Sequence, residues 1–337
     1  MAKTSEIISL TQRQIQELRK KHYGIAGHHS AVQLCHWTKK AIKGEGVCYK
    51  QIFYGIPTHR CAEITPVVLW CNNNCIYCWR PMEFMRYYDI REDQVDPPEF
   101  IVEELIRQRK QLLSGYRASP KVNQKILEES MEPVHFAISL SGEPTMYPLL
   151  DKMIKYIREK YNPISIFLVT NGQVPEMLEK LRDEHALPTQ LYISITAPDP
   201  ILYKKISRPV HKDAWDRLLR SLKIMSTVPC RRVIRLTVIK DYNMADEHLK
   251  GYSELIKMAN PDFVEVKAYM YLGMSTQRLK YENMPTHEEV KEYALKLLEY
   301  LPEFEYASEH PPSRIVLLRN KNHRVPLLLG RDSDYNL

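Results

Sequence analysis

The sequence lacks the apolar segments that mark membrane-spanning and exported proteins. No run of about 18 or more apolar residues occurs among its 337 residues, so we expect no membrane span. The N-terminal stretch MAKTSEIISLTQRQIQELRKKH has no apolar signal core and is typical of a polar helix. The chain also shows no internal repeat and no low-complexity segment. We therefore expect a cytoplasmic protein, in a compartment where thiols stay reduced and disulfides are rare.

A strong charge bias is missing as well. The 48 lysines and arginines exceed the 41 acidic residues by a formal +7, and the isoelectric point is near 8.9. So mild an excess permits a polyanionic partner but does not demonstrate one. Hydrophobic residues make up 44% and charged residues 26%, which is ordinary for a soluble enzyme. The length suffices for one large α/β domain or two ordinary ones.

Short apolar runs of β type alternate with stretches of helical apolar spacing along most of the chain. Such alternation predicts a parallel sheet covered by helices, with ligands bound at the C-terminal ends of the strands. Six units are too few for a closed eight-fold barrel, although Arg314–Asn320 can add a strand. The pattern predicts an α/β partial (β/α)6 TIM-like barrel. The six strands are expected at Ile64–Trp70, Val134–Leu140, Ile164–Thr170, Gln190–Thr196, Arg232–Ile239 and Asp262–Met270.

The loop after the first predicted strand carries three cysteines and lacks a fourth. The spacing is Cys71-x₃-Cys75-x₂-Cys78, and no histidine occurs in the next 30 residues. A structural zinc site needs four ligands. A [4Fe–4S] cluster held by three thiolates keeps one iron open to a ligand that is not protein. The spacing favours iron–sulfur, with zinc and unliganded thiols as the alternatives.

A second triplet lies upstream, at Cys35, Cys48 and Cys61. Six of the seven cysteines thus fall between Cys35 and Cys78, where even scattering would place about one. Gaps of this width suit three loop positions that converge in space, and three thiols again suit a cluster with one open iron. The alternatives are separately buried cysteines, or zinc completed by His36 or His59. Cys230 stands alone and is interpreted as a buried thiol.

Taken with the alternating strands, the downstream triplet resembles the radical S-adenosylmethionine (SAM) superfamily. An aromatic residue, Tyr77, precedes the third cysteine, and SGEP at 141–144 follows the second strand, both as in that superfamily. The resemblance implies that Cys71, Cys75 and Cys78 hold the cluster whose open iron is chelated by SAM. The SAM contacts implied are Gly142, Glu143 and Pro144, with Thr170, Asn171 and Ser194 as weaker candidates for the carboxylate and ribose.

Longer segments resemble one family within it, the tRNA 4-demethylwyosine synthases. They are residues 27–66, the CNNNCIYCWRP stretch, and VEVKAYMYLGMSTQRLKYENMPTHEEV at 264–290. The resemblance implies a second [4Fe–4S] cluster on Cys35, Cys48 and Cys61. It also implies an N-terminal extension at 1–63, a radical SAM core at 64–300 and a C-terminal extension at 301–337. Because about 63 residues are too few for the flavodoxin-like domain of eukaryotic members, we expect the shorter archaeal form and an external electron donor such as a flavodoxin or ferredoxin.

The reaction that the family resemblance implies joins pyruvate to 1-methylguanosine beside the anticodon of phenylalanine tRNA. Two pyruvate carbons enter a new third ring through a carbon–carbon bond, which makes the enzyme a lyase. An N-methyl C–H bond has no acidic proton, so a radical is required. Lys50, two residues after Cys48, is the candidate for a Schiff base with pyruvate. Lys39, Lys40 and Lys43 are its rivals, and we expect a monomer.

Two other functions remain open at this level. One is a radical SAM enzyme with an auxiliary cluster that acts on a peptide or small molecule. The other is a zinc-binding RNA module without catalytic activity. The basic stretches TKKAIKG, YKKISRP and CRRVIR could contact phosphates, and tyrosines near the mouth, such as Tyr87 and Tyr88, could stack on a flipped base.

Overall fold

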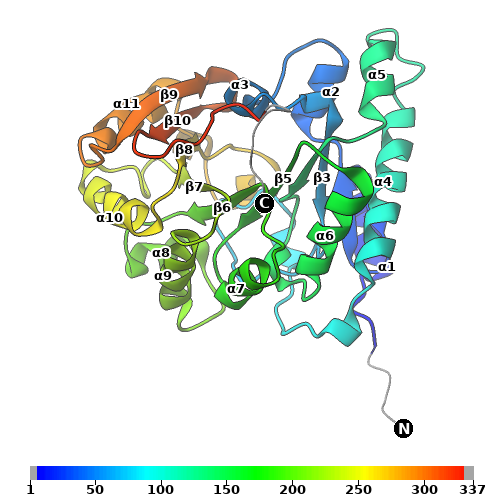
Figure 1. The fold of residues 1–337 in the computed structure, drawn as a ribbon, viewed down its shortest axis with the longest axis horizontal. Coiled ribbons are helices and arrows are strands. Elements are labelled where there is room, and N and C mark those ends of the chain that lie inside the picture. Colours follow the sequence, from blue (N-terminus) through cyan, green and yellow to red (C-terminus); the bar gives the residue numbers. More distant parts are fainter. Residues whose placement is uncertain (1–5, 330–337) are drawn as a thin grey trace.

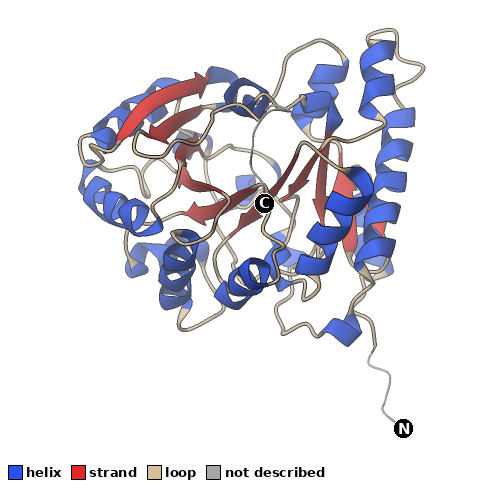
Figure 2. Cartoon of the chain, in the orientation of Figure 1, coloured by secondary structure: helices blue, strands red, loops and turns tan. Residues whose placement is uncertain are grey.

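A computed structural model describes residues 6–329, and a single ten-stranded sheet runs through them in the order β1-β2-β3-β4-β5-β6-β7-β8-β10-β9. Strands β3 to β8 are parallel, whereas β1–β2–β3 and β8–β10–β9 are antiparallel at the two edges (Figure 2). The strands are β1 Tyr23–Ala26, β2 Ser30–Gln33, β3 Cys61–Thr65, β4 His135–Ile138, β5 Ser165–Thr170, β6 Gln190–Ile195, β7 Arg231–Val238, β8 Phe263–Ala268, β9 Phe304–His310 and β10 Ile315–Asn320.

The six parallel strands confirm the predicted partial barrel. They are buried almost throughout, as strands covered on both faces should be. Within residues 6–329 the edge strands β1 and β9 do not pair with one another, so the sheet is not closed. The expected strand at Arg314–Asn320 is confirmed as β10, which joins the sheet beside β8.

Helices cover the outside of the curved sheet (Figure 1). Apolar residues of the strands that face them, such as Ile166, Leu168 and Leu191, form the main core with these helices. A capping box between Thr286 and Glu289 starts the last helix, α11. The helices are α1 Gln12–Lys20, α2 His36–Ile42, α3 Tyr49–Tyr54, α4 Pro98–Ser114, α5 Gln124–Ser130, α6 Leu150–Tyr161, α7 Pro175–Asp183, α8 Pro200–Ser207, α9 Ala214–Met225, α10 Leu249–Ala259 and α11 His287–Leu298.

A second core lies on the opposite face of the sheet, against α3. Tyr54 of this short helix packs edge to face on Phe167 of β5 and Phe263 of β8. Since side chains alternate along a strand, Phe167 points away from the outer helices that its neighbours Ile166 and Leu168 contact. Helix α3 therefore lies inside the partial barrel.

The first predicted strand is wrong in its bounds. The structure places β3 at Cys61–Thr65, because Pro66 ends the ladder and residues 66–70 continue as buried irregular chain. Residues 23–33, where no strand was predicted, form the β1–β2 hairpin, which extends the sheet beyond β3. No helix among residues 6–329 has the length and apolar character needed to cross a bilayer. Parts of the proposed extensions, residues 1–5 and 330–337, lie outside the described residues.

Candidate active site

The downstream cysteine triplet lies on the loop that leaves β3, as predicted. Backbone hydrogen bonds fix this loop: Cys71 N donates to Arg86 O at 3.1 Å, and Ile76 N donates to Ile206 O at 2.9 Å. Burial raises the pKa of the Cys75 thiol to about 12, and the neighbouring Cys78 adds to the rise. Since the thiolate is the form that binds metals, a positively charged centre at these sulfurs would be needed to keep them deprotonated.

The Gly-Glu-Pro loop after β4 packs directly on the start of the cysteine loop. Glu143 N donates to Trp70 O at 2.7 Å, and the Ser141 hydroxyl donates to Val68 O at 2.8 Å. Gly142 has φ +71°, and a Cβ there would lie 1.9 Å from Val67 O. Only glycine allows the two backbones to approach so closely.

The Glu143 carboxylate joins this loop to the tip of β5. It accepts hydrogen bonds from the Thr145 hydroxyl at 2.6 Å, the Thr170 hydroxyl at 2.7 Å and Asn171 N at 2.8 Å. Burial raises the pKa of Glu143, and these donors offset part of the rise. The structure thus brings Gly142, Glu143, Thr170 and Asn171 together, with Pro144 buried beside them.

Asn171 connects this network to the cysteines. Its amide nitrogen donates to Asn72 Oδ1 at 2.8 Å and lies 3.9 Å from Cys71 Sγ. Ser194 sits apart: it is half-buried on β6, opposite Arg235 in register, and takes no part in the Glu143 network within the described chain. Sequence reasoning missed Asn72, although its place inside CNNNC was the available signal.

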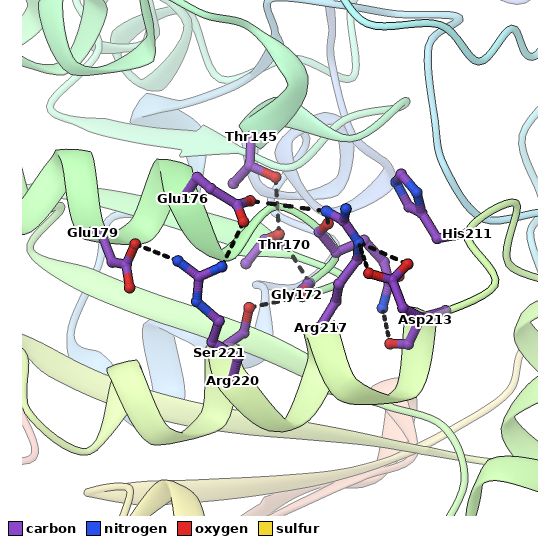
Figure 3. A network of polar contacts seen from close by, with 12 residues as sticks. Thr145, Thr170, Gly172, Glu176, Glu179, His211, Asp213, Arg217, Arg220 and Ser221 are labelled. Atoms are coloured by element: carbon purple, nitrogen blue, oxygen red, sulfur yellow. Dashed lines mark hydrogen bonds and ion pairs between the residues drawn. The ribbon is translucent and has the colours of Figure 1, made fainter.

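A polar network behind β5 holds the Thr170–Gly172 turn in place (Figure 3). Gly172 N donates to the Thr170 hydroxyl at 3.1 Å, and the Ser221 hydroxyl of α9 donates to Gly172 O at 2.7 Å. Arg220 of α9 binds Glu176 and Glu179 of α7, each at 2.6 Å. Helices α7 and α9 are therefore joined around the turn that presents Asn171.

A cavity of about 380 Å³ opens beside this network. Its lining includes Asn72, Thr145 and the two tyrosines Tyr87 and Tyr88. The Tyr87 hydroxyl lies 3.0 Å from His211 Nε2, and the two rings pack edge to face. Two of the tyrosines expected near the mouth thus border open space next to the candidate SAM site.

Hydrogen bonds and electrostatic interactions connect the three segments that carry the upstream cysteines. Cys35 and Cys48 are the residues before α2 and α3, and Cys61 is the first residue of β3. Burial raises the pKa of all three thiols, that of Cys48 to about 12, and the positive charge of Lys50 offsets part of each rise. Each thiol also interacts electrostatically with at least one other member of the triplet.

A hydrogen-bond hub around Thr58 holds the three cysteine segments together. The Thr58 hydroxyl accepts from Cys48 N at 3.0 Å and donates to Gln51 Oε1 at 2.9 Å. Its carbonyl accepts from the Thr38 hydroxyl at 3.3 Å, and Thr38 N donates to Cys35 Sγ at 3.3 Å. These residues were not predicted, because their spacing follows no local pattern.

Lys50 extends from α3 toward the inner face of β5. Its Nζ lies 5.1 Å from the centroid of the Phe167 ring, and no carboxylate of the described residues forms an ion pair with it. His135, whose Nε2 is buried without a partner in the described chain, packs on the same ring. Of the rival lysines, Lys39 and Lys40 lie on α2, Lys43 follows it, and Lys40 lies over the Trp37 ring at 5.4 Å.

The donor sets fit clusters better than single ions. Across residues 6–329, no three His, Cys, Asp or Glu side chains gather closely enough to hold one metal ion. Zinc requires such convergence, whereas the thiolates of a cubane bind separate irons. His59, proposed as a zinc ligand, instead pairs with Glu129 at 2.9 Å. Asn72 Nδ2 is buried beside Cys71 and has no hydrogen-bond partner among residues 6–329, so it is a donor suited to a polar cofactor.

The partial barrel, the three-cysteine loop and the Gly-Glu-Pro loop define a radical SAM protein. The family model described as "Radical SAM superfamily" matches residues 65–251, and the one described as "Wyosine base formation" matches residues 258–320. Within the superfamily, the chain belongs to the S-adenosyl-L-methionine-dependent tRNA 4-demethylwyosine synthases, and it is similar along most of its length to a member from Pyrococcus abyssi. The two are 48% identical over 300 residues, which cover 89% of this chain and 86% of the relative.

Two solved structures share the whole fold. A structure of TYW1 with a lysine–pyruvate adduct bound has a TM-score of 0.81 at 37% identity. The match covers 93% of this chain and 97% of the TYW1 chain. A crystal structure of archaeal TYW1 has a TM-score of 0.76 at 33% identity and covers 95% and 99%. The family predicted from the sequence is confirmed, and the non-catalytic zinc module is excluded.

Proposed function

We propose that this protein forms the tricyclic base of wyosine in tRNA, by condensing 1-methylguanosine next to the anticodon of phenylalanine tRNA with pyruvate. The observation that carries the proposal is the pairing of two half-buried thiol triplets with a lysine amine at the upstream one. The names of the relatives, and the lysine–pyruvate adduct named for one TYW1 structure, support the same reaction.

We assign the downstream thiols to a [4Fe–4S] cluster that binds SAM and the upstream thiols to a second [4Fe–4S] cluster. Reduced and bound to SAM, the first supplies a 5′-deoxyadenosyl radical able to take hydrogen from an unactivated methyl group. Around the first cluster, Gly142 lets the Gly-Glu-Pro loop pack closely on the cysteine loop, and Pro144 shapes the Gly-Glu-Pro loop. Asn171 and Asn72 present amide groups to SAM. Ser194 is retained as a candidate ribose contact.

Lys50 is proposed to hold pyruvate. Its amine attacks the ketone carbon and water leaves, so that the co-substrate is fixed as a Schiff base beside the upstream thiols. The methyl carbon of the guanosine, after it has lost a hydrogen atom to the radical, bonds to that carbon. The bond from the same carbon to the pyruvate carboxylate breaks, the carboxylate leaves as carbon dioxide, and two pyruvate carbons stay in the product. This sequence makes the enzyme a carbon–carbon bond-forming lyase. Closure of the new ring onto the base nitrogen displaces the lysine amine and returns it for another cycle.

The remaining partners follow from the same proposal. Cleavage of SAM to a radical requires one electron, which we expect to come from an external donor such as a flavodoxin or ferredoxin. We expect the protein to act in the cytoplasm, as a monomer. The division at residues 63/64 and 300/301 stays a prediction, although strands from both flanking segments join the sheet.

Anaerobic turnover with 1-methylguanosine tRNA, SAM and ¹³C-labelled pyruvate tests the reaction. Mass spectrometry of the digested nucleosides should show a tricyclic base that carries two labelled carbons. Cys71→Ala is the matched negative control. SAM cleavage without any labelled nucleoside, or label in a peptide product, would assign the protein to the alternative class of radical SAM enzyme.

A further inference from the structure

Helix α3 carries Lys50 but is too short to fix its own direction. It has six residues, begins directly after Cys48 and is followed by Gly55, whose φ is +73°. Isolated helices of this length are marginal in water, because nucleation costs more than a few hydrogen bonds return. Its position inside the barrel must therefore come from contacts with the surrounding strands.

A buried ion pair on β7 and β8 contacts both ends of this helix. Arg235 donates to Glu265 Oε2 through Nη2 at 2.8 Å and through Nε at 3.1 Å, and Glu265 is fully buried. The Tyr49 hydroxyl accepts from Arg235 Nη2 at 2.7 Å. The Tyr54 hydroxyl donates to Glu265 Oε1 at 2.8 Å. Each end of α3 thus has one hydrogen bond to a charged group.

The two contacts together fix how the helix is turned. At about 100° per residue, side chains five positions apart project about 140° apart around a helix. Anchoring both Tyr49 and Tyr54 therefore fixes the rotation of α3 as well as its position along the axis. Lys50, directly after Tyr49, is then aimed at the Phe167 side of the barrel, where its Nζ lies 5.1 Å from the ring centroid.

Stability alone does not explain this arrangement. Desolvation offsets most of the attraction between two buried charges, so apolar side chains of similar size would stabilise the fold about as well. Hydrogen bonds to charged groups, however, are directional and short. What the pair adds over apolar packing is a defined orientation of α3.

We propose that Arg235 and Glu265 are positioning residues for the condensation, acting through Tyr49 and Tyr54 to aim the Lys50 amine at pyruvate. This inference rests on the proposed function, since it takes Lys50 as the residue that binds pyruvate. Neither charged residue needs to touch the substrate.

The test is the double variant Tyr49→Phe/Tyr54→Phe, which keeps both rings and the ion pair but cuts both links to α3. With the reconstituted enzyme, borohydride trapping of labelled pyruvate on Lys50 should slow about tenfold or more, as expected for losing hydrogen bonds to charged groups. Iron content and SAM cleavage should stay at wild-type levels. Tyr54→Phe alone cuts one link and should slow trapping by a smaller, measurable factor.

Tyr192→Phe is the matched control. The Tyr192 hydroxyl donates to the same Glu265 Oε1 at 3.0 Å, but Tyr192 belongs to β6 and not to α3. Its loss should leave the trapping rate unchanged. Wild-type trapping in the double variant, or an equal loss in Tyr192→Phe, would overturn the inference. Absence of any adduct on Lys50 in the wild-type enzyme would instead overturn the proposed function, so the two failures are distinguishable.

Discussion

Glu143 and Thr170 are 27 residues apart in the chain, yet the Thr170 hydroxyl donates to the Glu143 carboxylate at 2.7 Å. With Thr145 and Asn171 N donating to the same carboxylate, its oxygens are occupied by the protein itself. Glu143 therefore fixes the tip of β5, and we propose that it acts on a bound cofactor through this contact.

Glu143→Gln should weaken SAM binding about tenfold, because an amide accepts these donors less well than a carboxylate does. The dissociation constant of the reconstituted enzyme, from equilibrium dialysis, measures the effect. Glu254→Gln changes an exposed carboxylate on α10 and serves as the control. Unchanged SAM affinity in Glu143→Gln would show that the tip of β5 is held without this residue.

Gly142 and Gly44 provide a matched pair of positive-φ glycines. Both have φ near +70°, but a Cβ at Gly142 meets Val67 O at 1.9 Å whereas one at Gly44 meets nothing within 4 Å. Gly44→Ala should cost about 1 kcal/mol for its backbone conformation, and Gly142→Ala about 3 kcal/mol or more, since backbone must also shift. Urea unfolding of the apoprotein measures both, and equal costs would contradict the close approach of the two loops.

The two cysteine triplets should be separable by mutation. Cys71→Ala should keep about half of the iron and lose SAM cleavage, because only the downstream triplet is broken. Cys48→Ala should also keep about half, but should retain some uncoupled SAM cleavage while losing product. Cys230→Ala removes a buried cysteine outside both triplets and should keep all the iron. SAM cleavage that persists in Cys71→Ala would refute the assignment of the first cluster.

The stability that Glu309 contributes by joining β9 to α11 should depend on pH. Burial alone would raise the pKa of Glu309. Hydrogen bonds from the side chains of His287, Tyr306 and Lys291 outweigh this effect and lower the pKa from 4.5 to about 2. A carboxyl with a depressed native pKa stabilises the fold above its unfolded pKa and loses that contribution as pH falls through the native value.

Glu309→Gln should therefore lower the unfolding free energy of the apoprotein by about 1–2 kcal/mol at pH 7. The difference from wild type should shrink steadily between pH 4.5 and pH 2, the range set by the two pKa values. Glu305→Gln, exposed on the same strand, should have no such effect. A difference that stays constant with pH would show that the charge of Glu309 is not responsible.

Much of the site was predictable because its signals are local. Cys71, Cys75 and Cys78 fall within eight residues, so their spacing alone singled them out. The Gly-Glu-Pro loop follows a clear apolar strand, but it was singled out through the resemblance to the radical SAM superfamily. The upstream triplet needed the family resemblance, since 13-residue gaps carry little information about convergence. The bounds of β3 were misjudged because the apolar run continues past Pro66, where the strand no longer forms hydrogen bonds with its neighbours in the sheet.

Long-range contacts were the part that sequence patterns could not supply. Tyr49 and Arg235 are 186 residues apart and meet only because α3 enters the barrel. Thr58 joins the segments that carry the upstream cysteines, but a single threonine in a loop matches no sequence pattern that would predict this role. Such contacts depend on how elements pack in three dimensions, which periodicity and spacing do not encode.

Covalent capture of pyruvate by Lys50 tests the central claim most directly. Borohydride reduction of the wild-type enzyme with labelled pyruvate should fix the label on the peptide that contains Lys50, as mapped by mass spectrometry. Lys50→Arg keeps the charge but cannot form the Schiff base. It should cleave SAM, trap no label and yield no labelled nucleoside. Trapping at full yield in Lys50→Arg, or wild-type amounts of labelled tricyclic base, would contradict the role of this lysine.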